Sequence, residues 1–149
     1  TTLFRSWRVM AKETGVNKSD SLFHSQNGGC FRPGVGVWAF PTFRFSVGTL
    51  DAPVITGAVR EGWSVTLNWE NDIDRPKAGN SDRVYVGYFY DTQPRAPQMV
   101  SCLGACRRDG RVIVDVPSAG QPDGTRLHLY LFFGNKMSSR FSPSEYVEA

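Results

Sequence analysis

Residues 63–70 read WSVTLNWE, and this stretch decides the fold class of the 149-residue chain. Its apolar residues alternate with polar ones: Trp63, Val65, Leu67 and Trp69 against Ser64, Thr66, Asn68 and Glu70. A period of two places the two sets on opposite faces of an extended chain. The stretch therefore predicts a half-buried β-strand.

Strand patterns recur on both sides of this stretch. We expect strands at residues 54–59, 83–91 (RVYVGYFYD), 98–107 (one or two short pieces), 111–116 (RVIVDV), 125–133 (TRLHLYLFF) and 141–147. About seven short strands at spacings of roughly eight to twelve residues are typical of an immunoglobulin-like or fibronectin III-like antiparallel sandwich. A parallel sheet would need helix-length connections, and no helical pattern of that length follows Pro53.

Two stretches carry more specific expectations. Residues 125–133 are hydrophobic on both faces, which predicts a central strand with extra material packed on its outer side. The three arginines 107, 108 and 111 surround Asp109-Gly110, a turn signal that predicts a polar hairpin tip.

The first fifty residues differ in composition from the rest. Residues 1–18 are loosely helical, residues 19–36 (SDSLFHSQNGGCFRPGVG) are irregular, and residues 42–50 predict a strand. We therefore divide the chain into an N-terminal extension, 1–50, and a sandwich, 51–149. The extension is expected to pack on the sandwich or on a neighbouring molecule.

Composition and charge exclude several classes of protein. Hydrophobic residues make up 40% and aromatic residues 13%, which is too apolar for a disordered chain. No apolar run approaches the length of a transmembrane helix, and no signal peptide is visible at the start. The net charge is +3, with +4 on residues 1–50 and −1 on residues 51–149. This excess is weak for a nucleic-acid-binding protein.

The order of Trp69, Tyr88, the valines of 112–116 and Tyr130 resembles that of a fibronectin type III domain. A second resemblance covers FSVGTL (45–50), LNW (67–69), SDRVYVGYF (81–89), LHLYLFF (127–133) and FSPSEYV (141–147). These segments resemble the C-terminal half of an uncharacterised family found mainly in Bacteroides-type bacteria. That resemblance implies no reaction, cofactor or catalytic residue.

No metal site is predicted. Cys102 and Cys106 form one loose pair, whereas structural zinc sites use two tight pairs, so Cys30 and the pair are interpreted as small buried hydrophobes. Glu70, Asp72, Asp74 and Asp82 cluster around one loop. Counted from Asp72, that loop lacks the glycine and glutamate of an EF-hand, and we interpret it as a solvated acidic loop.

No catalytic constellation is predicted either. The two histidines are His24, which lies in the irregular segment six residues before Cys30, and His128, which lies on a core strand. We interpret His128 as a hydrogen-bonded structural residue. Nucleophile motifs and phosphate-binding glycine patterns are absent. The sequence therefore predicts that the chain is not an enzyme and has no cofactor or small-molecule substrate.

The aromatic residues are the remaining candidates for function. Exposed aromatic side chains together with arginines are the usual anchors of interfaces. The candidate interaction residues are Arg5, Trp7, Arg8, Trp63, Tyr85 and Tyr90. The opposing interpretation, which we favour, is that the first fifty residues pack over one sheet face and bury these aromatics.

These observations predict a non-enzymatic interaction or assembly module that binds a protein partner or forms homo-oligomers. A phage virion or a cell-surface assembly is a setting suggested by analogy of fold, and it favours an extracellular or virion location over the cytoplasm. The alternative is a nucleic-acid-associated protein that uses the basic N-terminal segment, with Phe4 and Trp7 for stacking. A third hypothesis is a hydrolase that uses Cys30 and His24.

Overall fold

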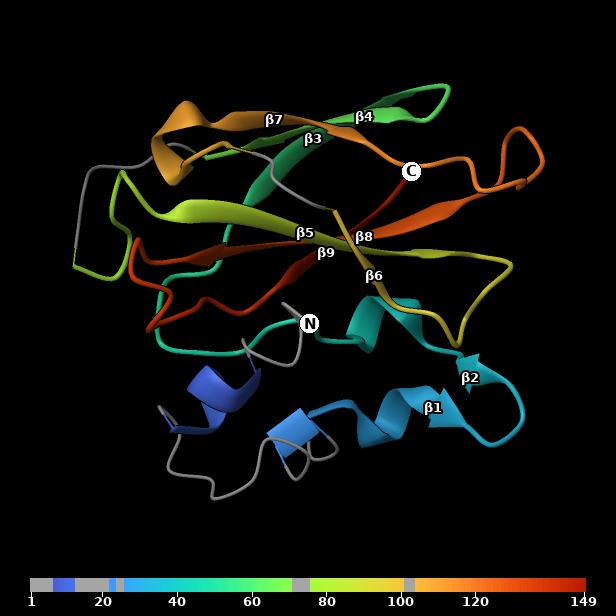
Figure 1. Cartoon of the computed structure of the whole chain (residues 1–149), viewed down its shortest axis with the longest axis horizontal. Coiled ribbons are helices and arrows are strands. Elements are labelled where there is room, and N and C mark those ends of the chain that lie inside the picture. Colours follow the sequence, from blue (N-terminus) through green and yellow to red (C-terminus); the bar gives the residue numbers. More distant parts are fainter. Residues whose placement is uncertain (1–6, 13–21, 24–25, 71–75, 101–103) are drawn as a thin grey trace.

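The computed structural model describes residues 7–12, 22–23, 26–70, 76–100 and 104–149. Two antiparallel sheets pack face to face (Figure 1). The first contains β3 (Ile55–Glu61), β4 (Ser64–Trp69) and β7 (Arg111–Asp115), in the order β3-β4-β7. The second contains β5 (Arg83–Tyr90), β6 (Gln98–Met99), β8 (Leu127–Gly134) and β9 (Glu145–Glu148), in the order β6-β5-β8-β9. The predicted all-β antiparallel sandwich is confirmed, with seven strands in the described part of the chain after Pro53.

The sandwich core lies between the two sheets. On β4 the residues Val65, Leu67 and Trp69 are buried, and the intervening residues are only half-buried, as the alternation predicts. Val112 and Val114 of β7 add to the same core, together with Val84, Val86 and Tyr88 of β5 and Leu127, Leu129, Leu131 and Phe133 of β8. Aliphatic and aromatic side chains from both inner faces therefore exclude water along the full length of the sandwich.

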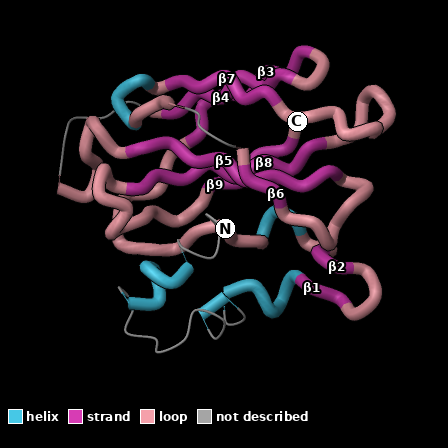
Figure 2. Tube along the Cα trace, in the orientation of Figure 1, coloured by secondary structure: helices cyan, strands magenta, loops and turns pink. Residues whose placement is uncertain are grey.

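A second core lies on the outer face of the four-stranded sheet. Every residue of β8 is buried, because the described part of residues 7–50 packs on that face (Figure 2). We call this part, residues 7–12, 22–23 and 26–50, the cover. Its buried residues Met10, Phe43 and Phe45 contact Phe89, Tyr130 and Phe132 of the sheet. The prediction that residues 125–133 form a central strand packed under extra material is confirmed.

The cover contains few regular elements. Residues 7–12, 22–23 and 26–27 are helical, and the short helices η1 (Gly28–Cys30) and η2 (Phe40–Thr42) flank a hairpin of β1 (Phe31–Arg32) and β2 (Gly36–Val37). Among the described residues, no helix is both long and apolar enough to cross a membrane.

Phe45 fixes the cover to the sheet at Gly87. A Cβ atom added at Gly87 would lie 2.2 Å from Cδ1 of the Phe45 ring. The ring therefore lies directly on the backbone of β5, where only glycine leaves room for it. Phe43, Phe89 and Tyr130 surround Phe45 with ring centroids 4.8–5.7 Å away.

The strand predicted at residues 42–50 is wrong. This segment is not part of a strand, and its backbone groups bond to side chains and loops instead of to a sheet. The Phe45 N–H donates to Ser144 Oγ (3.1 Å), and the Val47 N–H donates to Met10 Sδ (2.9 Å). The alternating aromatics reflect packing on the sheet below them and not membership of a sheet.

Candidate interaction surface

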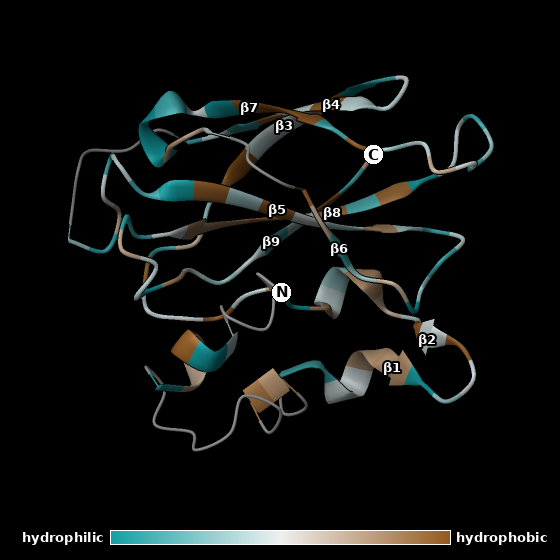
Figure 3. Cartoon of the chain, viewed as in Figure 1, coloured by the Kyte–Doolittle hydropathy of each residue, from teal (hydrophilic) through white to brown (hydrophobic). Residues whose placement is uncertain are grey.

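The β1–β2 hairpin presents a group of exposed apolar side chains. Phe31, Val35 and Trp38 are 40%, 48% and 48% exposed. Figure 3 shows hydrophobic residues on and beside the strands of this hairpin, at the edge of the molecule. We call Arg32, Val35 and Trp38 the hairpin surface. Phe31 lies on the opposite strand face with Val37, and its ring packs against Phe43 with centroids 5.9 Å apart. Exposed clusters of this kind mark interaction sites more often than single exposed residues do.

The hairpin is held firmly against the body of the protein. Its strands pair Phe31 with Val37 and Arg32 with Gly36, and the Trp38 N–H donates to the Cys30 carbonyl. The Val37 N–H donates to the Pro94 carbonyl (2.9 Å), and the Arg95 guanidinium donates to the Gly34 carbonyl. These bonds fix the hairpin surface before any partner binds, which lowers the entropic cost of binding.

Gly36 makes this close approach possible. Its φ angle is +97°, a conformation that side chains with a Cβ rarely adopt, and a Cβ there would lie 2.7 Å from the Pro94 carbonyl oxygen. The hairpin therefore seats on the 94–95 loop only with glycine at this position.

The hairpin surface combines aromatic and cationic groups. The Arg32 guanidinium carbon lies 4.3 Å from the centroid of the Trp38 ring, within the range of a cation–π contact. The described charged residues of the cover are Arg8, Lys12, Arg32 and Arg44, all exposed. No acidic residue occurs among the described residues of the cover. The surface is therefore suited to a ligand that offers negative charge and a flat or apolar group.

The structure separates the residues predicted for interaction. Trp7 and Tyr90 are buried, so their prediction as exposed anchors is wrong. Trp7 packs edge-to-face on Phe23 (5.1 Å), and the Tyr90 hydroxyl donates to the Pro117 carbonyl. Burial of Trp7 in the cover also removes it as a stacking platform for nucleic acid.

The other predicted residues lie apart from one another. Trp63 and Tyr85 are half-buried, Trp63 against Tyr90 in the sandwich and Tyr85 against Phe132 under the cover. Arg8 is exposed on the helical segment 7–12, and Arg5 and Phe4 lie outside the described residues. The hairpin surface was not predicted, because FRPGVG (31–36) was interpreted as part of an irregular segment. The available signal was Pro33-Gly34 between aromatic residues.

His128 connects two sheet strands and the cover. Its ring nitrogens lie 2.8 Å from the Tyr146 hydroxyl and 2.8 Å from an Asp91 carboxylate oxygen. The imidazole stacks on the Phe40 ring of the cover at 3.7 Å. The expected hydrogen-bonded histidine on a core strand is therefore confirmed.

Alkaline pH will destabilise the protein through tyrosines that are buried or half-buried. Burial, together with the charges of Glu148 and Asp91, raises the pKa of Tyr146 to about 12, and burial also raises the pKa of Tyr130 and Tyr88. Tyrosines in the unfolded chain lose their protons near pH 10, while the folded protein retains them. Stability is therefore fully present below about pH 10 and falls as the pH rises toward about 12.

Urea midpoints measured at about pH 9 and pH 11 test this fall. Tyr146→Phe should make the pH dependence shallower, because one of the shifted groups is removed. A midpoint that does not change between the two values would contradict the prediction.

Arg107 and Asp82, which were expected in a polar hairpin tip and a solvated loop, form a buried ion pair. Nε of Arg107 donates to Asp82 Oδ2 at 3.0 Å, and the guanidinium lies 4.0 Å from the Phe133 ring centroid. Arg107 and Phe133 also line a cleft of about 330 Å³ with residues 51–54 and Glu70.

The prediction of a polar hairpin tip at Arg107 is therefore wrong. The prediction that Asp82 lies in a solvated loop is also wrong. The chain passes from β6 in one sheet, through η3 (Arg107–Asp109), to β7 in the other sheet. This crossing carries Arg107 between the layers, where Asp82 neutralises it.

Metal-ligand geometry is not found in the described part of the chain, where no three His, Cys, Asp or Glu side chains come together. The Cys30 thiol is buried and donates to the Asn27 carbonyl, and burial raises its pKa. Cys106 is half-buried. His24, Asp72, Asp74 and Cys102 lie outside the described residues.

No protein-family model and no curated protein sequence matches the chain. A solved structure, the β-1,2-glucanase from Parabacteroides distasonis, is similar to 70% of this chain at 20% identity, with a TM-score of 0.45. This chain spans 13% of the length of that glucanase chain.

The expectation that the chain is not an enzyme is corrected by this finding, because the protein with the similar structure is an enzyme. The expectation failed because it rested on the lack of catalytic motifs within 149 residues.

Proposed function

We propose that this chain is an interaction or assembly module that binds an acidic segment of a protein partner through the hairpin surface. The observation that carries the proposal is the exposure of Val35 and Trp38, with Arg32 over the Trp38 ring, on a hairpin fixed to the body of the protein. Rigid aromatic side chains beside an arginine are the typical centre of a protein interface. A multisubunit particle, such as a virion or a cell-surface assembly, is the setting that this role suggests.

Charge supports an acidic partner. Arg32 lies over Trp38, and Arg95 reaches the hairpin at Gly34. A carboxylate that approaches Trp38 would therefore meet at least one guanidinium, and charge-assisted hydrogen bonds of this kind are stronger than neutral ones. Nucleic acid is the competing ligand for a basic aromatic surface.

Selection of peptides from a random display library on the folded protein tests the proposal. Peptides that carry Asp or Glu next to an aromatic residue or proline should be enriched. Trp38→Ala and Arg32→Ala should each reduce their affinity by about tenfold or more, which is the size expected for central interface residues. Met137→Ala is the matched control, because Met137 is exposed and lies on the 135–140 turn.

Two outcomes would contradict the proposal. Selected peptides could bind Trp38→Ala as well as the wild type, which would place binding elsewhere. A single-stranded oligothymidine could instead bind more tightly than the peptides, with affinity falling steeply as salt rises. That second result would favour the nucleic-acid function.

A further inference from the structure

No described segment packs on the outer face of the β3-β4-β7 sheet, whereas the cover packs on the outer face of the other sheet (Figure 1). Three rows of side chains cross the outer face of the β3-β4-β7 sheet. The pairing register gives the rows as Gly57–Asn68–Arg111, Val59–Thr66–Ile113 and Glu61–Ser64–Asp115. We call these nine residues the open face.

The central row of the open face is apolar and β-branched. Val59 is 59% exposed and Ile113 is 54% exposed, and Thr66 lies between them on β4. The branched side chains of this row lie in adjacent positions and form a continuous row across the three strands. A complementary surface that covers this row removes its apolar side chains from water, which lowers the free energy.

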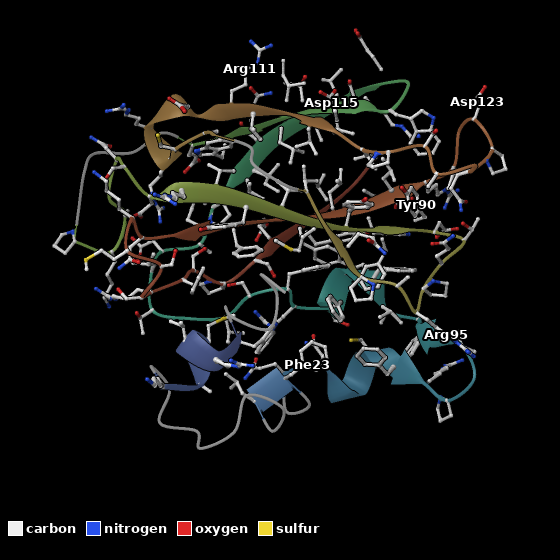
Figure 4. The ribbon with its side chains drawn as sticks, viewed as in Figure 1. Phe23, Tyr90, Arg95, Arg111, Asp115 and Asp123 are labelled. Atoms are coloured by element: carbon white, nitrogen blue, oxygen red, sulfur yellow. The ribbon has the colours of Figure 1, made fainter. Side chains whose placement is uncertain are left out.

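The two flanking rows carry opposite charge. One end of β7 presents Arg111, and the other end presents Asp115, with Glu61 in the same row (Figure 4). At about 3.4 Å per residue, Arg111 and Asp115 lie roughly 14 Å apart along the strand. Ile113 lies midway between them.

We propose that the open face binds the open face of a second copy of this chain, related by a two-fold axis that runs across the strands. Such an axis reverses the strand direction and leaves each strand opposite its own copy. Ile113 then faces Ile113, Val59 faces Val59, and each Arg111 faces the Asp115 of the other copy. A two-fold axis along the strands would instead place β7 opposite β3, with Arg111 opposite Gly57 and Asp115 opposite Glu61.

The dimensions fit this arrangement. Sheets that pack face to face lie about 10 Å apart. An extended arginine side chain and an aspartate together cover about this spacing, so two Arg111–Asp115 pairs can close the ends of the interface. The open face has nine residues, fewer than the roughly 20–30 per partner of a standard stable interface, so the dimer forms only at high protein concentration.

This inference is independent of the hairpin surface, which lies on the cover side of the molecule. Sedimentation velocity of the purified chain, from about 10 µM to about 1 mM, tests it. The wild type should change from monomer to dimer across this range. Trp38→Ala should dimerise like the wild type, so that failure of the proposed function and failure of this inference are distinguishable.

Charge exchange identifies the partner as a second copy. Arg111→Asp and Asp115→Arg should each weaken the dimer by about tenfold, because like charges then face each other twice. The double variant R111D/D115R should recover affinity to within about threefold of the wild type, since both pairs are restored in reverse. Ile113→Asp should abolish dimerisation, and Val59→Ser should weaken it. Met137→Asp, in the 135–140 turn, is the control that should have no effect.

Three results would overturn the proposal. They are a wild type that stays monomeric at about 1 mM, a double variant as weak as the single variants, and a dimer that survives Ile113→Asp. Thermal melting of each variant establishes that it is folded. If Ile113→Asp does not fold, Val59→Ser and the charge exchange still decide the question.

Discussion

Gly87→Ala will detach the cover from the sheet and destabilise the protein by about 3 kcal/mol. The added Cβ would lie 2.2 Å from Cδ1 and 2.3 Å from Cε1 of the fully buried Phe45 ring. The ring cannot turn away without clashing with Phe43 and Tyr130, whose centroids lie 5.1 Å and 4.8 Å from it. The contact between cover and sheet must therefore open.

Hydrogen exchange and denaturant unfolding measure this effect. Backbone amides of the cover should lose protection in the variant, while β4 and β7 should keep theirs because the sandwich core is not touched. Gly57→Ala is the matched control. Gly57 also lies within a strand, but the nearest atom to its Cβ position is Asn68 Nδ2 at 3.7 Å, an ordinary contact. Equal destabilisation by both substitutions would contradict the role assigned to Phe45.

Arg107→Met will cost about 3–5 kcal/mol, because it leaves the buried Asp82 carboxylate without its cation. Methionine keeps the apolar volume next to Phe133 but removes the charge and the Nε donor that lies 3.0 Å from Asp82. The loss therefore reports the uncompensated charge more than the packing. Urea unfolding of the variant and the wild type at neutral pH gives the difference.

Two further variants establish the cause of that loss. Asp82→Asn in the Arg107→Met background should recover part of the stability, since a neutral amide is less costly to bury than an unpaired carboxylate. Arg126→Met removes the exposed Arg126–Glu148 pair, with its 3.5 Å N–O distance, and should cost at most about 1 kcal/mol. A large loss in the exposed pair, or no recovery in the double variant, would refute the explanation.

The sandwich could be predicted from the sequence because its signals are local. In β4 every second residue is apolar, and in β7 Val112 and Val114 share one face; the structure buries these residues. β8 lacks a polar face, and this identified it as a strand covered on both sides. Such patterns depend only on neighbours along the chain.

The cover and the hairpin surface depend on contacts between distant parts of the chain. Phe43 and Phe45 alternate like strand residues, yet their burial comes from Gly87 and Tyr130, which lie more than forty residues away. The exposure of Trp38 and the burial of Trp7 follow from the same docking. A tryptophan in a short irregular segment gives no local sign of which side it will face.

The charge pairing of Arg107 was missed for a related reason. Three arginines around Asp109-Gly110 are indistinguishable by composition, and only the passage from one sheet to the other buries the first of them. The topology that selects Arg107 is a property of the whole sandwich and not of the turn.

The cover differs from the sandwich in amino-acid composition, but the two parts share a hydrophobic core. A fragment that began at residue 51 would expose Phe89, Tyr130 and Phe132 on one face of the sheet. Such an apolar surface promotes aggregation during expression. The compositional border at residue 50 is therefore a poor place to cut this protein.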